Sequence, residues 1–278
     1  MKLGSDAEWK LLADLLEEQF GLSFTGVRRE ILESRLTPRF AAVHCAGPLQ
    51  YYHHLRFHPE RDRELAALPA AVTNNESFFF REAHHFRIIT QHVVPALRDE
   101  LRRRPLRILS AGCSSGEEPY SIVITLQEET FGQLPKGWEI DACDLNPARL
   151  AQAREAHYGE NALRNCDEGA RRRYFCQRDG RYVLLERYRE GVRFFPANLA
   201  REETPLPWDA YDVILCRNLL IYFRDEAFLR TAGRLARALA PGGLLLLGHS
   251  ESLIDREPVL QPVIVDGVVV YRRRLEAA

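Results

Sequence analysis

A turn rich in glycine and serine occupies residues 110–116, with Gly112 and Gly116 four positions apart. Such a turn lets backbone amides approach a ligand closely, at a helix N-terminus that favours an anion. The strict Gly-x-Gly-x-x-Gly fingerprint of dinucleotide loops is absent. Asp144 follows 28 residues after Gly116, where a carboxylate can accept hydrogen bonds from both hydroxyls of a ribose. These features are typical of a site for a dinucleotide or for S-adenosyl-L-methionine. A tight turn with an N-capping aspartate is the purely structural alternative.

Two glutamates, Glu117 and Glu118, directly follow the turn. Carboxylates at this point would repel a diphosphate, whereas they would attract the ammonium and sulfonium groups of S-adenosyl-L-methionine. Acidic residues are also favoured in the first turn of a helix that binds nothing. The pair therefore favours S-adenosyl-L-methionine as the cofactor, with helix stabilisation as the alternative for either glutamate alone.

The elements that would position this turn alternate between strand and helix after Pro105. We expect strands at 106–109, 140–144, 211–216 and 244–248, and helices at 119–129, 147–157 and 225–239. This alternation predicts an α/β fold with a doubly wound, mostly parallel sheet. Three further short strands are expected at 174–176, 181–185 and 192–195, with a hairpin turn at Asp179-Gly180. They predict a small antiparallel β-subdomain attached to the main sheet.

The first quarter of the chain carries only helical patterns. We expect helices at 6–20, at 25–36, where Pro38 kinks or ends the helix, and at 48–71 in two pieces broken near Pro59. The expected organisation is a small all-α domain over 1–70, a linker over 71–104 and an α/β domain over 105–278. The β-subdomain is expected at about 170–195.

Composition limits the classes of partner. The 38 Lys and Arg residues balance 39 Asp and Glu residues, so bulk charge predicts no nucleic-acid partner and no binding to a membrane surface. No stretch approaches the ~18 uncharged apolar residues of a transmembrane helix, and residues 1–21 are charged throughout, so we expect neither membrane insertion nor a secretory signal. The six cysteines form no Cys-x-x-Cys pair, which predicts no metal site and reduced thiols in the cytoplasm.

Four segments resemble, in chain order, those of CheR-type chemoreceptor methyltransferases. Ser110-Ala-Gly-Cys-Ser-Ser-Gly-Glu-Glu-Pro-Tyr-Ser121 looks like their cofactor loop. Thr73-Asn-Asn-Glu-Ser-Phe-Phe-Phe-Arg-Glu82 resembles their interdomain segment, which usually reads Thr-Asn-x-Thr-x-Phe-Phe-Arg. Cys216-Arg-Asn-Leu-Leu-Ile-Tyr-Phe223 and Gly248-His-Ser-Glu-Ser252 match motifs that follow two of their later strands. The resemblance extends from about residue 10 to residue 272, and four motifs together are highly specific.

The resemblance implies a reaction and a set of site residues. A Rossmann-like domain would transfer the methyl group of S-adenosyl-L-methionine to glutamate side chains in the cytoplasmic helical region of bacterial chemoreceptors. The products would be glutamate methyl esters and S-adenosyl-L-homocysteine, and the linker would contribute to the cofactor site. Asp144 is implied at the ribose, Asn198 and Leu199 at the adenine, and Arg217 and Asn218 near the reacting end. The other implied cofactor residues are Asn75, Ser77, Arg81, Gly112 and Glu117.

A glutamate acceptor sets modest chemical demands. Its carboxylate is ionised at neutral pH, because its reference pKa is about 4.3, so the nucleophile needs no general base. Catalysis would depend on in-line alignment with water excluded. Arg81 and Tyr222 are candidates to orient the carboxylate, with an interdomain salt bridge and a locally satisfied hydroxyl as their alternatives. We expect His84 and His85 in packing, whereas His249 could line the pocket or shape its turn.

Four arginines in or just past the second expected helix form a candidate docking surface, namely Arg28, Arg29, Arg35 and Arg39. Positive charge there would attract the glutamate-bearing receptor region and speed encounter. An ordinary solvated helix face is the alternative.

Two other functions stay open, a methyltransferase for another acceptor and a signalling adaptor that binds S-adenosyl-L-methionine without turnover. The Asn-Pro-Pro-Tyr signature of amino-group methylation is absent, which counts against nucleic-acid bases as the acceptor.

The hairpin turn within residues 176–180 is short. Members of the resembling family that grip a receptor's C-terminal pentapeptide by strand addition tend to have a longer, glycine-rich loop. We therefore predict that a pentapeptide tether is not required here. Isothermal titration of a receptor C-terminal pentapeptide into the protein should give no tight binding. Saturable heats at low peptide concentration would contradict the prediction.

Overall fold

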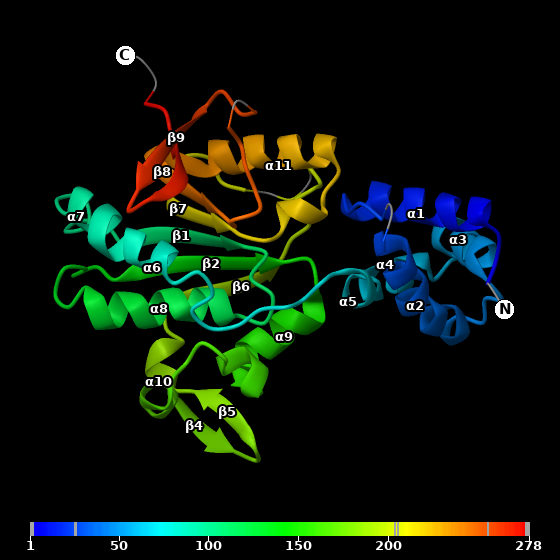
Figure 1. Cartoon of the computed structure of the whole chain (residues 1–278), viewed down its shortest axis with the longest axis horizontal. Coiled ribbons are helices and arrows are strands. Elements are labelled where there is room, and N and C mark those ends of the chain that lie inside the picture. Colours follow the sequence, from blue (N-terminus) through cyan, green and yellow to red (C-terminus); the bar gives the residue numbers. More distant parts are fainter. Residues whose placement is uncertain (1–2, 25–26, 203, 205, 255, 276–278) are drawn as a thin grey trace.

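The computed structural model describes residues 3–24, 27–202, 204, 206–254 and 256–275, and the side chains of 27–29 also lie outside this description. A helical unit, blue in Figure 1, packs against the end of a larger α/β unit. None of the helices in the described part of the chain has the length and apolar character needed to cross a bilayer.

The helical unit follows the expected segments closely. Its elements are α1 (Asp6–Phe20), α2 (Val27–Ala42), α3 (Pro48–Phe57), α4 (Arg61–Ala67) and α5 (Pro69–Val72). A capping box between Ser5 and Glu8 starts α1, and Gly21 ends it at φ +72°, donating its N–H to the Glu17 carbonyl. The expectation that Pro38 could end the second helix is wrong. Leu36 and Phe40, on either side of Pro38, are buried in the core of this unit, and this packing outweighs the lost hydrogen bond.

The α/β unit confirms the doubly wound, mostly parallel sheet. Its strand order is β6-β2-β1-β7-β8-β10-β9, in which only β10 and β9 run antiparallel to their neighbours. The strands are β1 (Leu106–Ala111), β2 (Trp138–Asp144), β6 (Val192–Pro196), β7 (Tyr211–Cys216), β8 (Leu239–Leu247), β9 (Leu260–Val265) and β10 (Val268–Arg273). The last two were not expected, and they close one edge of the sheet as a hairpin.

Alternate side chains of the central strands face two different helical layers. Ile108 of β1 and Val213 of β7 pack with α8 (Glu117–Glu129). The segment before β1 lies on the same side and comprises α6 (His84–Ile88), a π-helical turn (Ile89–Val93) and α7 (Val94–Ala96). Leu109 and Ile214, one position further along each strand, pack with α11 (Asp225–Ala238). A strand buried on both faces places its carboxyl end, and the loop that follows, at one fixed edge of the sheet.

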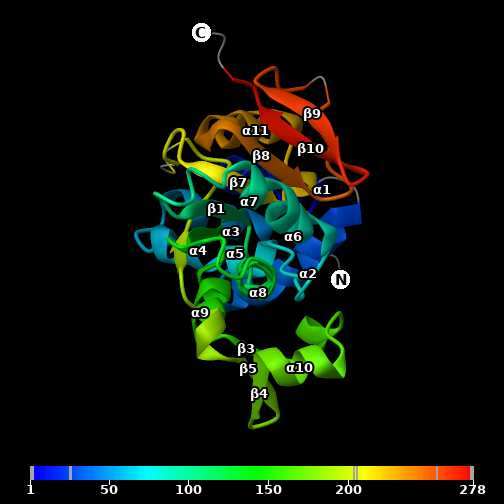
Figure 2. The ribbon, with the colours of Figure 1, turned by 90° about the vertical axis from the view of Figure 1, so that its left-hand side faces the viewer.

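The antiparallel β-subdomain is confirmed, although its membership differs from the expectation. It has the order β3-β5-β4, formed by His157–Tyr158, Arg181–Leu184 and Phe175–Arg178. With the short helix α10 (Glu168–Tyr174) it projects from the main sheet (Figure 2). The Asp179-Gly180 turn forms with φ +48° and +72°. The strand expected at 192–195 belongs elsewhere, because β6 pairs in parallel with β2 at the edge of the main sheet.

Main-chain contacts join the two units. The Ser23 N–H donates to the Tyr222 carbonyl at 2.7 Å, and Leu22 forms an isolated antiparallel bridge with Phe223. The buried Glu17 also pairs with Arg224 at the start of α11. The end of α1 is therefore fixed to the loop that follows β7, and the space between them becomes part of one cavity.

Candidate functional site

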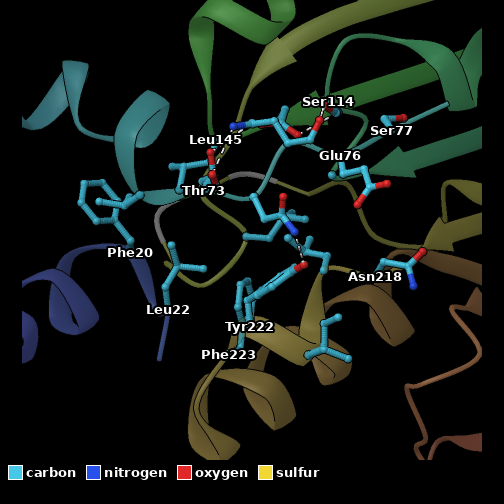
Figure 3. Close-up of a pocket in the computed structure, with 18 of the residues that line it drawn as sticks. Phe20, Leu22, Thr73, Glu76, Ser77, Ser114, Leu145, Asn218, Tyr222 and Phe223 are labelled. Atoms are coloured by element: carbon cyan, nitrogen blue, oxygen red, sulfur yellow. Dashed lines mark hydrogen bonds between the residues drawn. The ribbon is translucent and has the colours of Figure 1, made fainter. Parts of the chain in front are cut away.

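A cavity of about 310 Å³ lies between the two units, beyond the carboxyl ends of β1, β2 and β7. Figure 3 shows its wall, formed by Phe20 and Leu22 of the helical unit, the segment from Thr73, and Tyr222 and Phe223 of the α/β unit. In open α/β sheets, ligands bind at this edge. Of the cofactor and orienting residues expected from the sequence, all except Glu117 line the cavity.

The turn after β1 requires its glycines. Gly112 adopts φ +85°, and a Cβ there would lie 3.1 Å from the Leu219 side chain. Gly116 adopts φ +91°. The N–H groups of Gly112 and Cys113 both donate to the Cys143 carbonyl, at 2.8 and 2.9 Å. Those two amides are therefore engaged with β2.

Asp144 ends β2 and lines the cavity, half-buried. Its two carboxylate oxygens accept N–H bonds from Ser114 and Asn146, each at 2.8 Å. Burial raises the pKa of Asp144, and these hydrogen bonds oppose that rise. Each carboxylate oxygen has a second lone pair, so the group can still accept bonds from a ligand.

The segment that links the two units is fixed through Asn75 to the turn after β1 and to the end of β2. The Asn75 Oδ1 atom accepts from Thr73 Oγ1 at 3.0 Å and from Asn146 Nδ2 at 3.1 Å. The Asn75 carbonyl accepts from Ser114 Oγ at 3.3 Å. Asn146 was not among the expected site residues, although it lies only two positions after Asp144 in the sequence. Ser77 also lines the cavity (Figure 3).

The two glutamates after the turn have different surroundings. Glu117 is 3 % exposed and does not line the cavity, and Ser115 Oγ lies 2.9 and 3.0 Å from its two oxygens. Burial raises the pKa of Glu117. Glu118 lines the cavity and accepts from Ser110 Oγ at 2.6 Å and from Arg217 Nε at 2.7 Å.

Arg217 occupies the centre of a buried charge network. Beyond its bond to Glu118, its Nη1 donates to the Arg81 carbonyl at 2.7 Å. The same nitrogen lies 3.3 Å from His85 Nδ1 and 3.8 Å from Glu82 Oε2. Arg217 thus ties the end of β7 to the start of α8 and to the linker. His85 lies in packing, as expected.

The remaining expected residues line the cavity and also contact other parts of the chain. Tyr222 accepts a hydrogen bond at its hydroxyl from Asn74 Nδ2 at 2.8 Å. The Arg81 guanidinium stacks on the Phe78 ring with a centroid distance of 5.5 Å and lies 3.4 Å from the Glu76 carbonyl. Asn198 donates to the carbonyl of Gln19 at 2.9 Å, so its side chain joins the two units.

Of the four expected docking arginines, the structure describes the side chains of Arg35 and Arg39, and these two have different surroundings. Arg35 is exposed, lines the cavity and donates to the Thr73 carbonyl at 2.8 Å. Arg39 instead pairs with the buried Glu64 inside the helical unit. The side chains of Arg28 and Arg29 lie outside the described residues.

Among the described residues, Glu82, His84 and His85 are the group whose donor atoms gather closely enough for a metal ion, within 4.8 Å of one another. His249 Nδ1 lies 2.9 Å from Glu82 Oε1, and His249 is 73 % exposed at its side chain. The Arg217 guanidinium beside Glu82 and His85 would repel a second cation there. The hydrogen bond from His249 and the charge of Arg217 outweigh burial and hold the pKa of Glu82 below its usual value.

Comparison with known proteins gives a consistent result. Residues 7–73 match the family model "CheR methyltransferase, all-alpha domain", and residues 75–266 match "CheR methyltransferase, SAM binding domain". The chain is 35 % identical over 253 residues to chemotaxis protein methyltransferase 2 of Vibrio cholerae, covering 90 % of this chain and 86 % of that protein. It is 34 % identical over 261 residues to the chemotaxis protein methyltransferase of Escherichia coli, covering 91 % and 87 %.

The buried His85 makes stability depend on pH. Burial and the neighbouring Arg217 lower its pKa to about 3, so the native protein keeps it neutral while the unfolded chain protonates it below its ordinary value of 6.5. Stability is therefore lost as pH falls below that ordinary value, by about 2 kcal/mol between pH 7 and pH 5 for this one group. Urea unfolding at the two pH values should show this loss, and His85→Gln should remove it. The exposed His53→Gln is the control, and equal losses in wild type and His85→Gln would contradict the prediction.

Proposed function

The chain belongs to the CheR methyltransferase family, and from that premise we propose that it transfers the methyl group of S-adenosyl-L-methionine to glutamate side chains of chemoreceptors. The products are glutamate methyl esters and S-adenosyl-L-homocysteine. The observation that carries the proposal is the cavity itself, where the linker, the turn after β1, the end of β2 and the loop after β7 converge on one space. The proposal makes the protein cytoplasmic, because the helical region of chemoreceptors lies there.

The cavity suits the chemical groups of S-adenosyl-L-methionine. When bound, this cofactor supplies an electrophilic methyl group on a positively charged sulfur. Asp144 offers carboxylate oxygens to the ribose hydroxyls, and Ala197 and Leu199 offer apolar surface to the adenine. Asn75, Ser77 and Arg81 also line the cavity and are assigned to the methionine end. Glu117, buried beside Ser115, adds negative charge behind the turn.

The acceptor carboxylate needs alignment rather than activation. Arg81 and Tyr222, which both line the cavity, are assigned to orient it. Asn74 donates to the Tyr222 hydroxyl, which fixes the position of that hydroxyl in the cavity wall. Arg35 extends positive charge to the cavity wall and would attract the acidic receptor segment. Positioning of this kind can supply a large part of the rate enhancement of a bimolecular reaction.

The decisive test is tritiated methyl transfer from S-adenosyl-L-methionine to membranes that contain the organism's chemoreceptors. We expect incorporation of label into receptor bands and release of volatile methanol in base, because carboxyl methyl esters are base-labile. Receptors whose methylated glutamates are replaced by alanine provide the control. Absence of label, with cofactor binding intact by calorimetry, would instead favour an adaptor without turnover. Label that is stable in base would indicate a different acceptor group.

Asp144→Asn tests the assignment of the ribose site. The loss of a charged hydrogen-bond acceptor costs roughly 1.5–3 kcal/mol, so the Kd for S-adenosyl-L-homocysteine should rise about tenfold or more. Asp141→Asn is a matched control on the same strand, since Asp141 bonds to Arg193 and Tyr211 and is absent from the cavity wall. Calorimetric titration of both variants measures the effect. Equal affinities in the two variants would overturn the assignment.

A further inference from the structure

The loop after β7 is organised by one carboxylate from the turn after β8. Glu251 is 8 % exposed, and its Oε1 atom accepts N–H bonds from Leu219, Leu220 and Ile221 at 2.9, 2.7 and 3.3 Å. Its Oε2 atom accepts from Asn218 at 2.9 Å and from Gly248 at 2.8 Å. Five backbone dipoles therefore converge on one side chain.

The five N–H groups compensate the negative charge of the Glu251 carboxylate, a role that a basic side chain often has. Within the described residues, no ion pair of Glu251 with a basic side chain is present, and burial of an uncompensated carboxylate is costly. Hydrogen bonds to an ionised acceptor are shorter and stronger than those between neutral groups. The arrangement thus stabilises the charge and holds the loop, because each N–H is fixed in direction by its neighbours.

The backbone on both sides is shaped to allow this contact. Asn218 adopts φ +56°, a conformation that costs energy outside glycine and persists where its surroundings enforce it. A Cβ at Gly248 would lie 2.9 Å from the Asn218 nitrogen and 3.0 Å from Glu251 Oε2. Glycine at 248 therefore permits the close approach of the two loops.

The same loop carries the groups that face the cavity. Asn218, Leu219 and Ile221 line it, and so does Tyr222. The loop also accepts the hydrogen bond from Ser23 of the helical unit through the Tyr222 carbonyl. A single conformation of this loop therefore serves both the cavity wall and the contact with the helical unit. A loop that only connected β7 to α11 would not need to meet both demands.

We propose that Glu251 is a positioning residue for methyl transfer, which sets the loop 218–222 in its reactive geometry before cofactor or acceptor arrives. This rests on the proposed function, in which Tyr222 orients the acceptor. Glu251 touches neither substrate nor cofactor and acts through the backbone of the loop. Its loss would disturb the alignment step rather than the docking of the receptor.

Hydrogen exchange on the wild-type protein provides the first test. The amides of residues 218–221 should be protected in the free protein, and S-adenosyl-L-homocysteine should add little protection, since the loop is organised in advance. Mass spectrometry of a peptide that spans residues 217–223 measures this without any acceptor. Free exchange before ligand binding, followed by protection on binding, would overturn the proposal.

Substitution provides the second test. Glu251→Gln turns an NH₂ group toward amide donors, so the 217–223 peptide should exchange faster and kcat should fall about 100-fold, the scale of a 1 Å misplacement. KM for the receptor should stay unchanged, and Glu251→Asp, which keeps the charge, should recover part of kcat. Glu257→Gln, on the same segment, is the matched control. Wild-type kcat in Glu251→Gln would refute the proposal, and failure of that variant to fold leaves the decision to the wild-type exchange experiment.

The two proposals can fail separately. Protected loop amides together with no transfer to any receptor would overturn the proposed function and leave the role of Glu251 in loop geometry intact. Receptor methylation together with unprotected amides in the free protein would do the reverse.

Discussion

The buried guanidinium of Arg217 is the group on which the rest of the site depends. It leaves β7, pairs with Glu118 at 2.7 Å and donates to the Arg81 carbonyl at the same distance, so strand, helix and linker meet around one charge. Removing a cation from water is costly, and only the complete set of partners offsets that cost. The place of the linker turn therefore depends on the packing of both β7 and α8. The cavity is a property of the finished fold rather than of any single segment.

Much of this arrangement follows from sequence. The alternation of strands and helices predicts the parallel sheet, and the resemblance implies that Gly112, Asp144 and Asn218 belong to one site, where all three line the cavity. Which strands pair with each other is harder to predict than where each strand lies in the sequence. The pattern at 192–195 identifies a strand, yet nothing in it distinguishes an edge position beside β2 from a place in the small sheet.

The direction in which each side chain points is the second feature that the sequence does not predict. Glu117 and Glu118 are adjacent on a helix, and only tertiary packing decides that the second faces the cavity while the first is buried beside Ser115. Glu251 lies in the motif Gly248–Ser252, which resembles a family motif but gives Glu251 no expected role. Its partners are backbone amides, which every residue has, so no pattern of side chains marks them. Contacts between side chain and main chain leave little trace in a single sequence.

The place of the β-subdomain in the fold affects how the sequence of such a protein can change in evolution. The chain leaves the main architecture after α9 (Pro147–Glu155), builds the small sheet and α10, and returns as β6 beside β2. Both attachment points lie at one edge of the sheet, and in Figure 1 the excursion lies below the main sheet while the helical unit lies at its right-hand end (Figures 1 and 2). Insertions at such edges leave the strand order intact. This part of the molecule can lengthen, shorten or be exchanged between lineages while the chemistry at the opposite strand ends is inherited unaltered.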